Sequence, residues 1–182
     1  MFNLKKLAFG AALLAASAVC FAAPKVEIVT SEGNIVVNLN EKAAPTTVAN
    51  FVKYANEGFY NGTIFHRVIN NFMIQGGGFD RNLHQKSTHA PIKLEDKNGL
   101  KNTVGTIAMA RTNNPDSATS QFFINLKDND FLNGTSTKDG YAVFGEVVSG
   151  MDVVRKIGRA PTGSKGFMDD VPVRPVIIES VK

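Results

Sequence analysis

The chain has 182 residues, of which 20 are basic and 16 acidic, a formal net charge of +4 and a single cysteine. Basic and acidic residues are interspersed, so the sequence offers no basic stripe for nucleic acid and no polybasic segment for a membrane surface. One cysteine cannot form an internal disulfide. Because Cys20 lies in a predicted targeting segment, cysteine catalysis is excluded in the rest of the chain.

The first 22 residues have the pattern of a secretory signal peptide. Two lysines precede an apolar run over residues 7–19, and a small-x-small sequence ends at Ala22, the predicted cleavage site. A transmembrane anchor is one alternative, but the run is well short of the ~20 residues that a bilayer span needs. A lipid-modified cysteine is another, which the bulky Val19 beside it disfavours. Cleavage leaves residues 23–182 as one domain of ordinary size, with a net charge of +2.

Short β-rich runs separated by turn signals dominate the remaining chain. They are Val26–Thr30, Asn34–Leu39, Thr63–Val68, Phe72–Gly76, Thr106–Ala110, Gln121–Leu126, Tyr141–Val148 and Val176–Val181, with a weaker run at Pro91–Glu95. The first two form a predicted hairpin. The polar stretch 77–102 around the weak run predicts a surface loop, of a length that usually shapes a site or packs over one.

Two predicted helices interrupt these strands. The first follows Pro45, with Thr46 or Thr47 as its N-cap and Gly58 where it stops, and the second spans Met151–Ile157. The apolar face of the first helix carries Val48, Phe51, Val52 and Ala55. Isolated helices among many strands do not make alternating βαβ units. We therefore expect a mainly β protein whose antiparallel sheet closes into a barrel, with the helices over its ends.

Two strand-like stretches carry polar side chains that could share one surface. They are residues 65–79 (FHRVINNFMIQGGGF) and 109–125 (MARTNNPDSATSQFFIN). Strand alternation places Arg67 on the same face as Phe65 and opposite to His66. The arginine and the histidine are therefore not expected to point into the same site.

The same alternation brings two glutamines beside apolar side chains. A tight turn at residues 69–71 folds the next strand back and places Met73 and Gln75 on a common face, while Gln121 and Phe123 share a face of their own strand. Each side chain alone is more simply explained as surface or core. Amides among buried apolar groups are nevertheless costly unless their donors and acceptors are used. Together these residues indicate a site that binds a ligand rather than one that forms bonds to it.

Other kinds of site lack the residues that they need. His66 is expected to be a hydrogen-bonded structural residue, and no cluster of histidine, cysteine and carboxylate has the spacing of a metal site. Glycines 76–78 are not followed by Lys-Ser/Thr or by a helix, so they indicate close backbone packing or a bulge rather than a phosphate cradle. The sequence has no Gly-x-Ser-x-Gly elbow for a serine hydrolase and no tryptophan or convincing acid pair for a sugar site. No cofactor is expected.

The strings FHRVINNFMIQGGGF, TSQFFIN and YAVFGEVVSGMDVV, in this order, closely resemble the cyclophilin family of peptidyl-prolyl cis-trans isomerases. The similarity runs from about Val26 to Val181. Together with the signal peptide, the chain resembles the periplasmic bacterial cyclophilins, which implies a location in the periplasm. The resemblance also implies an eight-stranded antiparallel barrel capped by two helices.

The resemblance further implies roles for individual residues. Arg67 is the catalytic arginine and Gln75 the residue that orients the substrate. The proline pocket falls on Phe72, Met73, Phe123 and Leu132, and the peptide groove on Ala110, Arg111, Thr112 and Gln121. Phe131 and Tyr141 complete the binding surface at positions where tryptophan and histidine are common, so we expect cyclosporin to bind weakly. Because Phe72 and Met73 would alternate in a strand, Phe72 must sit at the strand entrance.

Such a site can catalyse rotation about an X-Pro bond without a nucleophile, base, metal or cofactor. Amide resonance sets a barrier near ~20 kcal/mol, and the proline nitrogen gains a lone pair only in the twisted state. A guanidinium that donates to this nitrogen stabilises the twisted state more than either planar isomer. The expected partners are proline-containing segments of unfolded or flexible proteins, bound by a monomer. A binding module that holds such segments without isomerising them would use the same groove and stands as the alternative.

Overall fold

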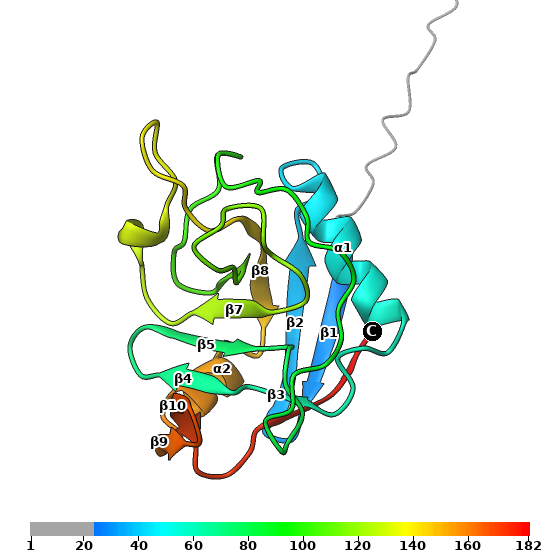
Figure 1. Cartoon of the computed structure of the whole chain (residues 1–182), viewed down its shortest axis with the longest axis vertical. Coiled ribbons are helices and arrows are strands. Elements are labelled where there is room, and N and C mark those ends of the chain that lie inside the picture. The colour runs from blue at the N-terminus through cyan, green and yellow to red at the C-terminus, as the bar shows by residue number, and fades with distance from the viewer. Residues whose placement is uncertain (1–23) are drawn as a thin grey trace, which may run out of the picture.

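The short strands build one curled antiparallel sheet (Figure 1). The structure, a computed structural model, describes residues 24–182, so the predicted signal peptide lies outside the described residues. Within these residues, hydrogen bonds join nine strands in the order β3-β11-β1-β2-β8-β6-β7-β5-β4. Their bounds are β1 (Lys25–Thr30), β2 (Gly33–Leu39), β3 (Thr63–Ile64), β4 (Arg67–Ile69), β5 (Met73–Gly76), β6 (Thr106–Met109), β7 (Phe122–Asn125), β8 (Val143–Ser149) and β11 (Ile177–Val181).

The sheet is a half-barrel, which corrects the closed eight-stranded barrel expected from the sequence. Across residues 24–182, its two edges are β3 and β4, which follow each other in the chain without pairing. The predicted strand 63–68 divides here because Phe65 and Val68 both pack in the interior. Residues three positions apart cannot face the same way in one regular strand. The division supplies the ninth strand and leaves the barrel open at this point.

Aromatic rings fill the interior of the curled sheet and hold helix α1 (Pro45–Asn56) against it. The ring of Phe51, in α1, has its centroid 5.2 Å from those of Tyr60 and Phe144. It also meets the ring of Phe122 edge-on at 5.5 Å. Burial of a large apolar side chain contributes ~1.5–3 kcal/mol, so a few such rings fix the position of the helix.

The start of α1 differs from the prediction. Its N-cap is Ala44, and neither Thr46 nor Thr47 provides a side-chain cap. Instead, the Glu95 carboxylate accepts hydrogen bonds from the backbone N–H groups of both threonines, at 3.2 and 2.8 Å, and from the Thr47 hydroxyl at 2.7 Å. A carboxylate there satisfies free N–H groups and complements the helix dipole. The long loop that contains Glu95 is thereby tied to the helix.

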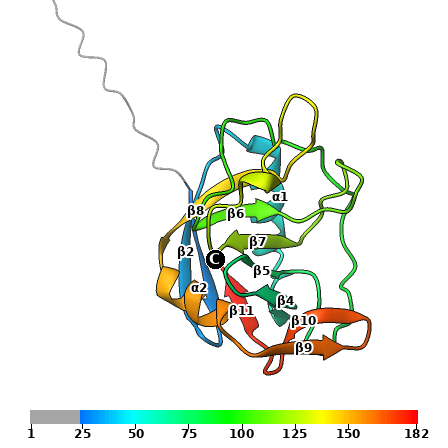
Figure 2. The same ribbon diagram turned by 90° about the vertical axis from the view of Figure 1, so that its left-hand side faces the viewer.

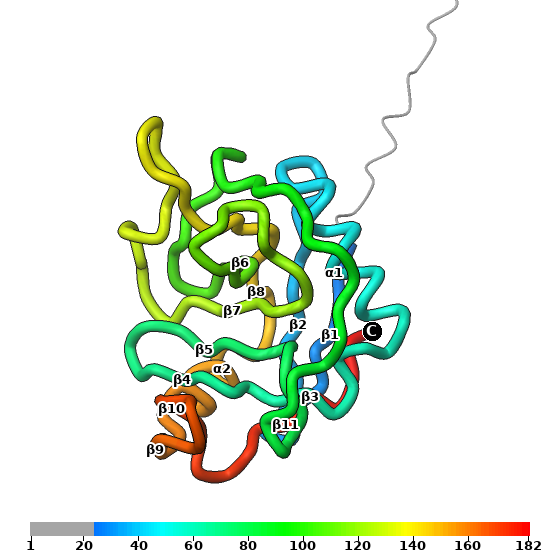
Figure 3. The backbone as a smooth tube through the Cα atoms, viewed as in Figure 1, coloured from blue at the N-terminus to red at the C-terminus, as the bar shows by residue number. Residues whose placement is uncertain are grey.

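The weak strand expected at Pro91–Glu95 is absent, because only Ile92 makes an isolated bridge, to Ala118. The chain between β5 and β6 otherwise runs as the predicted surface loop (Figure 3). The second predicted helix is confirmed as α2 (Met151–Gly158). A short 3-10 turn, η1 (Asp130–Leu132), precedes β8.

A two-stranded ribbon that the sequence did not predict completes the fold. It consists of β9 (Thr162–Lys165) and β10 (Met168–Pro172), which pair with each other and not with the main sheet. All four residues of β9 are exposed, so the run lacks the alternation that marks a half-buried strand. The ribbon packs beside β4, as both views show (Figures 1 and 2).

Candidate functional site

A row of cross-strand neighbours carries the predicted catalytic residues. The register pairs Arg67 of β4 with Gln75 of β5, and Gln75 with Phe123 of β7. Phe123 in turn pairs with Ala108 of β6. The residue that follows Arg67, Val68, packs inside the sheet, so the row faces outward. The prediction that Phe65 shares the face of Arg67 is wrong, because the strand is interrupted between β3 and β4.

An apolar slot lies along this row, on the outer face of the sheet. Its floor is a buried cluster of Met73, Ala108, Phe123 and Val143. The pocket above it has a volume of about 270 Å³. Its lining comprises Arg67, Phe72, Met73, Gln75, Ala110, Arg111, Phe123, Leu132 and Tyr141. All of these were predicted from the sequence as site residues, and Phe72 precedes β5, at the strand entrance.

Two cationic groups line the pocket, the guanidinium groups of Arg67 and Arg111. The Arg67 side chain is 44% exposed, and its Nε lies 4.0 Å from Oδ2 of Asp170. It therefore stands at the edge of the slot, in contact with solvent. A guanidinium next to an apolar floor can donate to a group held in the slot without being buried itself.

Arg111 also lines the pocket, but each of its three side-chain nitrogens already donates a hydrogen bond. Its Nε donates to the carbonyl of Gly140 at 2.8 Å, and its two terminal nitrogens donate to the carbonyls of Thr112 and Asp139. The guanidinium also lies 4.6 Å from the ring centroid of Tyr141. Arg111 thus holds the segment before β8 in place as a wall of the pocket.

Three predicted site residues lie outside the pocket lining. The hydroxyl of Thr112 donates to Oγ of Ser117 at 2.8 Å, and the side chain is turned into its own loop. Phe131 is 58% exposed and stacks on Phe72 with ring centroids 5.6 Å apart, so it forms part of the rim. Gln121 does not line the pocket itself but is hydrogen-bonded to the side-chain amide of a residue that does.

That second amide is Gln75, whose Nε2 donates to Oε1 of Gln121 at 3.0 Å. The two predicted glutamines are therefore joined to each other. Gly78 permits this arrangement, because a Cβ built there would lie 2.4 Å from Cγ of Gln121. Close packing of this kind is what the three consecutive glycines were expected to allow.

A buried network of asparagines, which the sequence did not reveal, holds the pocket walls. Asn102, Asn125 and Asn129 are each at most 1% exposed. Asn125 donates to Oδ1 of Asn102 and accepts from Nδ2 of Asn129. The side chains of the other two asparagines donate to backbone carbonyls of residues in the pocket wall. Asn129 donates to Phe72, and Asn102 donates to Leu132 and Tyr141. Asparagine is so common in loops that its sequence position carried no signal.

His66 lies beside the site without lining the pocket. It is 6% exposed, and its ring centroid lies 4.6 Å from that of Phe79. Burial lowers the pKa of His66 to about 4; the backbone of Ile64 opposes this shift, and the charge of Arg67 adds to it. The ring is therefore neutral at pH 7, as expected of a structural residue. Its Nδ1 is buried without a hydrogen-bond partner among the described residues, which differs from the expected hydrogen-bonded side chain.

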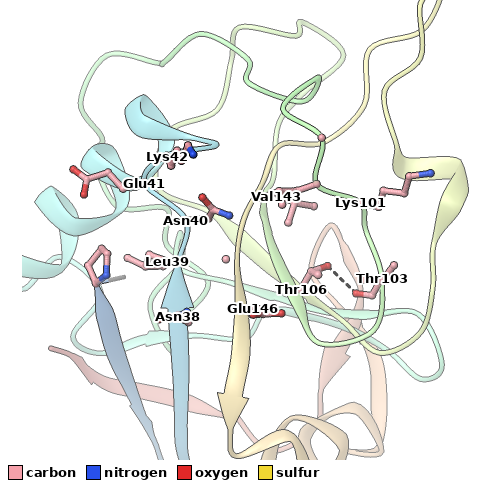
Figure 4. Close-up of a pocket in the computed structure, with 14 residues that line it drawn as sticks. Asn38, Leu39, Asn40, Glu41, Lys42, Lys101, Thr103, Thr106, Val143 and Glu146 are labelled. Carbon is pink, nitrogen blue, oxygen red and sulfur yellow. Dashed lines mark hydrogen bonds between the residues drawn. The ribbon is translucent and has the colours of Figure 1, made fainter. Parts of the chain in front are cut away.

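A larger cavity, of about 550 Å³, contains none of the predicted residues (Figure 4). It lies between the end of β2, strand β8 and the segment 99–106. Its charged lining residues, Glu41, Lys42, Lys101 and Glu146, are of both signs. Volume alone does not identify a site, and the larger cavity brings together none of the residues that the sequence indicated for binding or catalysis.

Across residues 24–182, no group of three or more histidine, cysteine, aspartate and glutamate side chains could hold a metal ion. In the same part of the chain, no helix has the length and apolar character needed to cross a membrane.

Comparisons with known proteins identify related chains. The family described as cyclophilin type peptidyl-prolyl cis-trans isomerase/CLD matches residues 25–182. A peptidyl-prolyl cis-trans isomerase of Acinetobacter baylyi is 56% identical over 179 residues, which cover 98% of this chain and 95% of that protein. Peptidyl-prolyl cis-trans isomerase B of Escherichia coli is 61% identical over 155 residues, covering 84% and 94%. The crystal structure of a Cryptosporidium parvum cyclophilin type isomerase in the presence of the dipeptide Ala-Pro is similar with a TM-score of 0.73 and 27% identity, covering 87% of this chain and 97% of that one.

Proposed function

The chain belongs to the cyclophilin-type peptidyl-prolyl cis-trans isomerases, and from this premise we propose that it isomerises X-Pro bonds in proteins that fold after export, with Arg67 as its catalytic residue. The observation that carries the residue assignment is one of geometry. An exposed guanidinium borders an apolar pocket of about 270 Å³, in the same cross-strand row as Gln75 and Phe123. The solved relative was crystallised with Ala-Pro, which supports a proline-containing ligand for this pocket.

The pocket acts on the proline ring and the guanidinium on the nitrogen. The floor formed by Met73 and Phe123 binds the pyrrolidine ring through apolar contact, which fixes one side of the peptide bond while the other turns. As the bond twists, resonance is lost and the nitrogen becomes a hydrogen-bond acceptor. Arg67 donates to it in this state only, so the contact lowers the barrier rather than merely tightening binding.

The amide pair positions the peptide backbone. Gln75 uses its Nε2 on Gln121, and among the described residues its Oε1 accepts no hydrogen bond. That oxygen is free for a backbone N–H of the substrate. Each tenfold acceleration requires ~1.4 kcal/mol, so one charged hydrogen bond, an apolar slot and fixed orientation together supply a useful rate enhancement.

Replacement of Arg67 tests this mechanism. Arg67→Ala should lower kcat/KM for an Ala-Pro peptide by about 10- to 100-fold, since a hydrogen bond from a charged donor is worth ~1.5–3 kcal/mol. Arg67→Lys should lose most of the activity as well, because an ammonium cannot reproduce the planar fork. Arg155→Ala, an exposed arginine on α2, is the matched control. Unchanged turnover in folded Arg67→Ala, measured by NMR exchange, would reject the assignment.

Export is the second part of the proposal. It rests on the signal-peptide pattern of residues 1–22, and it makes residues 23–182 the mature, monomeric domain in the periplasm. Expression of the full chain in a bacterium, followed by cell fractionation and N-terminal sequencing, should recover a monomer beginning at Ala23 in the periplasmic fraction. Recovery in the cytoplasm with Met1 retained would contradict export and leave the isomerase mechanism untouched.

A further inference from the structure

The unpredicted ribbon contains an irregularity next to Arg67. The pairing of β9 with β10 shifts register between Met168 and Val171. Within this bulge, Asp170 has a φ of +59°, in the left-handed region. Few residues other than glycine adopt that region, and aspartate and asparagine are the usual exceptions. Bulges of this kind redirect a side chain and are frequent beside active sites.

The two consecutive carboxylates within this bulge have different partners. Oδ1 of Asp169 accepts a hydrogen bond from the Ser164 hydroxyl at 2.6 Å, within the ribbon. Asp170 instead faces β4, with Oδ2 4.0 Å from Nε of Arg67. Both members of the pair are partly exposed, at 42% and 44%. Neighbouring residues of a strand face opposite ways, and here it is Asp170 that meets Arg67.

Arg67 has no other polar restraint in the described chain. No hydrogen bond joins it to Gln75, its cross-strand partner, because the amide of Gln75 is directed to Gln121. β4 is also the edge of the main sheet, so no further strand of that sheet flanks it. A long, half-exposed side chain would otherwise sample many rotamers.

We propose that Asp170 is a positioning residue, which holds the guanidinium of Arg67 from its Nε side and leaves the two terminal nitrogens directed at the substrate. The inference rests on the proposed function of Arg67. An exposed ion pair has a modest effect, so loss of the carboxylate should lower kcat/KM by about two- to fivefold. Asp170 does not touch the substrate, so the affinity for peptide should stay the same.

Asp170→Asn is the decisive variant, because asparagine keeps the left-handed preference and removes only the charge. Asp169→Asn is its matched control, one residue away and directed at Ser164. With an Ala-Pro peptide, Asp170→Asn should lower kcat/KM and leave the peptide Kd, measured by NMR titration, and the Tm unchanged. Asp169→Asn should leave all three quantities unchanged. At 1 M salt the kcat/KM values of the two variants should become equal, because charges in solvent are screened over ~3 Å at that ionic strength.

A double mutant separates positioning from a structural effect. In the Arg67→Ala background, Asp170→Asn should produce no further loss, since the residue acts only through Arg67. An additive loss, a raised peptide Kd, equal effects of the two aspartate variants, or unchanged or increased turnover in Asp170→Asn would each overturn the proposal. If Arg67→Ala itself retains full activity, it is the proposed function that fails.

Discussion

Protonation of His66 should make folding stability fall steeply in mild acid. The pKa of this buried ring is about 4 in the folded protein, against an ordinary value of 6.5. As the pH falls below 6.5, the unfolded chain binds a proton at this site while the folded chain does not, so unfolding is favoured. The loss should begin near pH 6.5 and level off below pH 4. Each tenfold difference in proton affinity is worth ~1.4 kcal/mol, which gives a total of roughly 3 kcal/mol.

Urea unfolding at pH 7, 5.5 and 4 measures this effect when the protein is compared with a His66→Leu variant. The two proteins share every other ionisable group, so the difference between the two pH profiles isolates His66. The free energy of unfolding of the variant should depend less on pH, by roughly 3 kcal/mol over this range. His84→Asn, at a side chain that is 79% exposed, should keep the steep profile of the parent protein. Parallel profiles for the parent and His66→Leu would show that the ring is not buried in its neutral form, and the reasoning would be wrong.

Two further predictions concern the pocket walls. Asn125→Leu should lower the free energy of unfolding by about 2–4 kcal/mol, measured by chemical denaturation, because it leaves buried polar groups of Asn102 and Asn129 without a partner; a loss below 1 kcal/mol would mean that the network does not hold the walls. Phe131→Trp should increase cyclosporin affinity by about three- to tenfold in a calorimetric titration, because the rim gains an indole N–H donor, and an unchanged Kd would contradict the predicted role of this position.

Where strands are regular, local patterning correctly predicted which side chains share a face. Met73 and Gln75 are two residues apart in β5, and so are Gln121 and Phe123 at β7, so alternation alone placed each pair. Register then joined the strands. The other residues of the pocket lining had been indicated by the family resemblance and not by alternation: Phe72, Ala110, Arg111, Leu132 and Tyr141. Alternation could not predict the interruption of the strand at Phe65. There the ring packs in the core, and the regular alternation of the strand is lost.

The rest of the site depends on contacts between distant segments. Asn102, Asn125 and Asn129 come together only after two loops and β7 have been placed. A lone asparagine in a loop is ordinarily a turn residue. Glu95 replaces the threonine cap of α1 from a loop nearly fifty positions away. The ribbon was missed because β9 is exposed along its whole length and has no apolar alternation to detect.

The open edge of the sheet explains why the ribbon matters for the chemistry. A closed barrel would have paired β4 on both sides and left no free edge beside it. In the half-barrel, β4 is bonded to β5 alone, and β10 packs along its other side without joining the sheet. Arg67 lies on the outward face of β4, and its half-exposed side chain is accessible to a segment of another protein. The cost of this exposure is loss of orientation, and Asp170 on the ribbon is placed to restore it from outside the sheet.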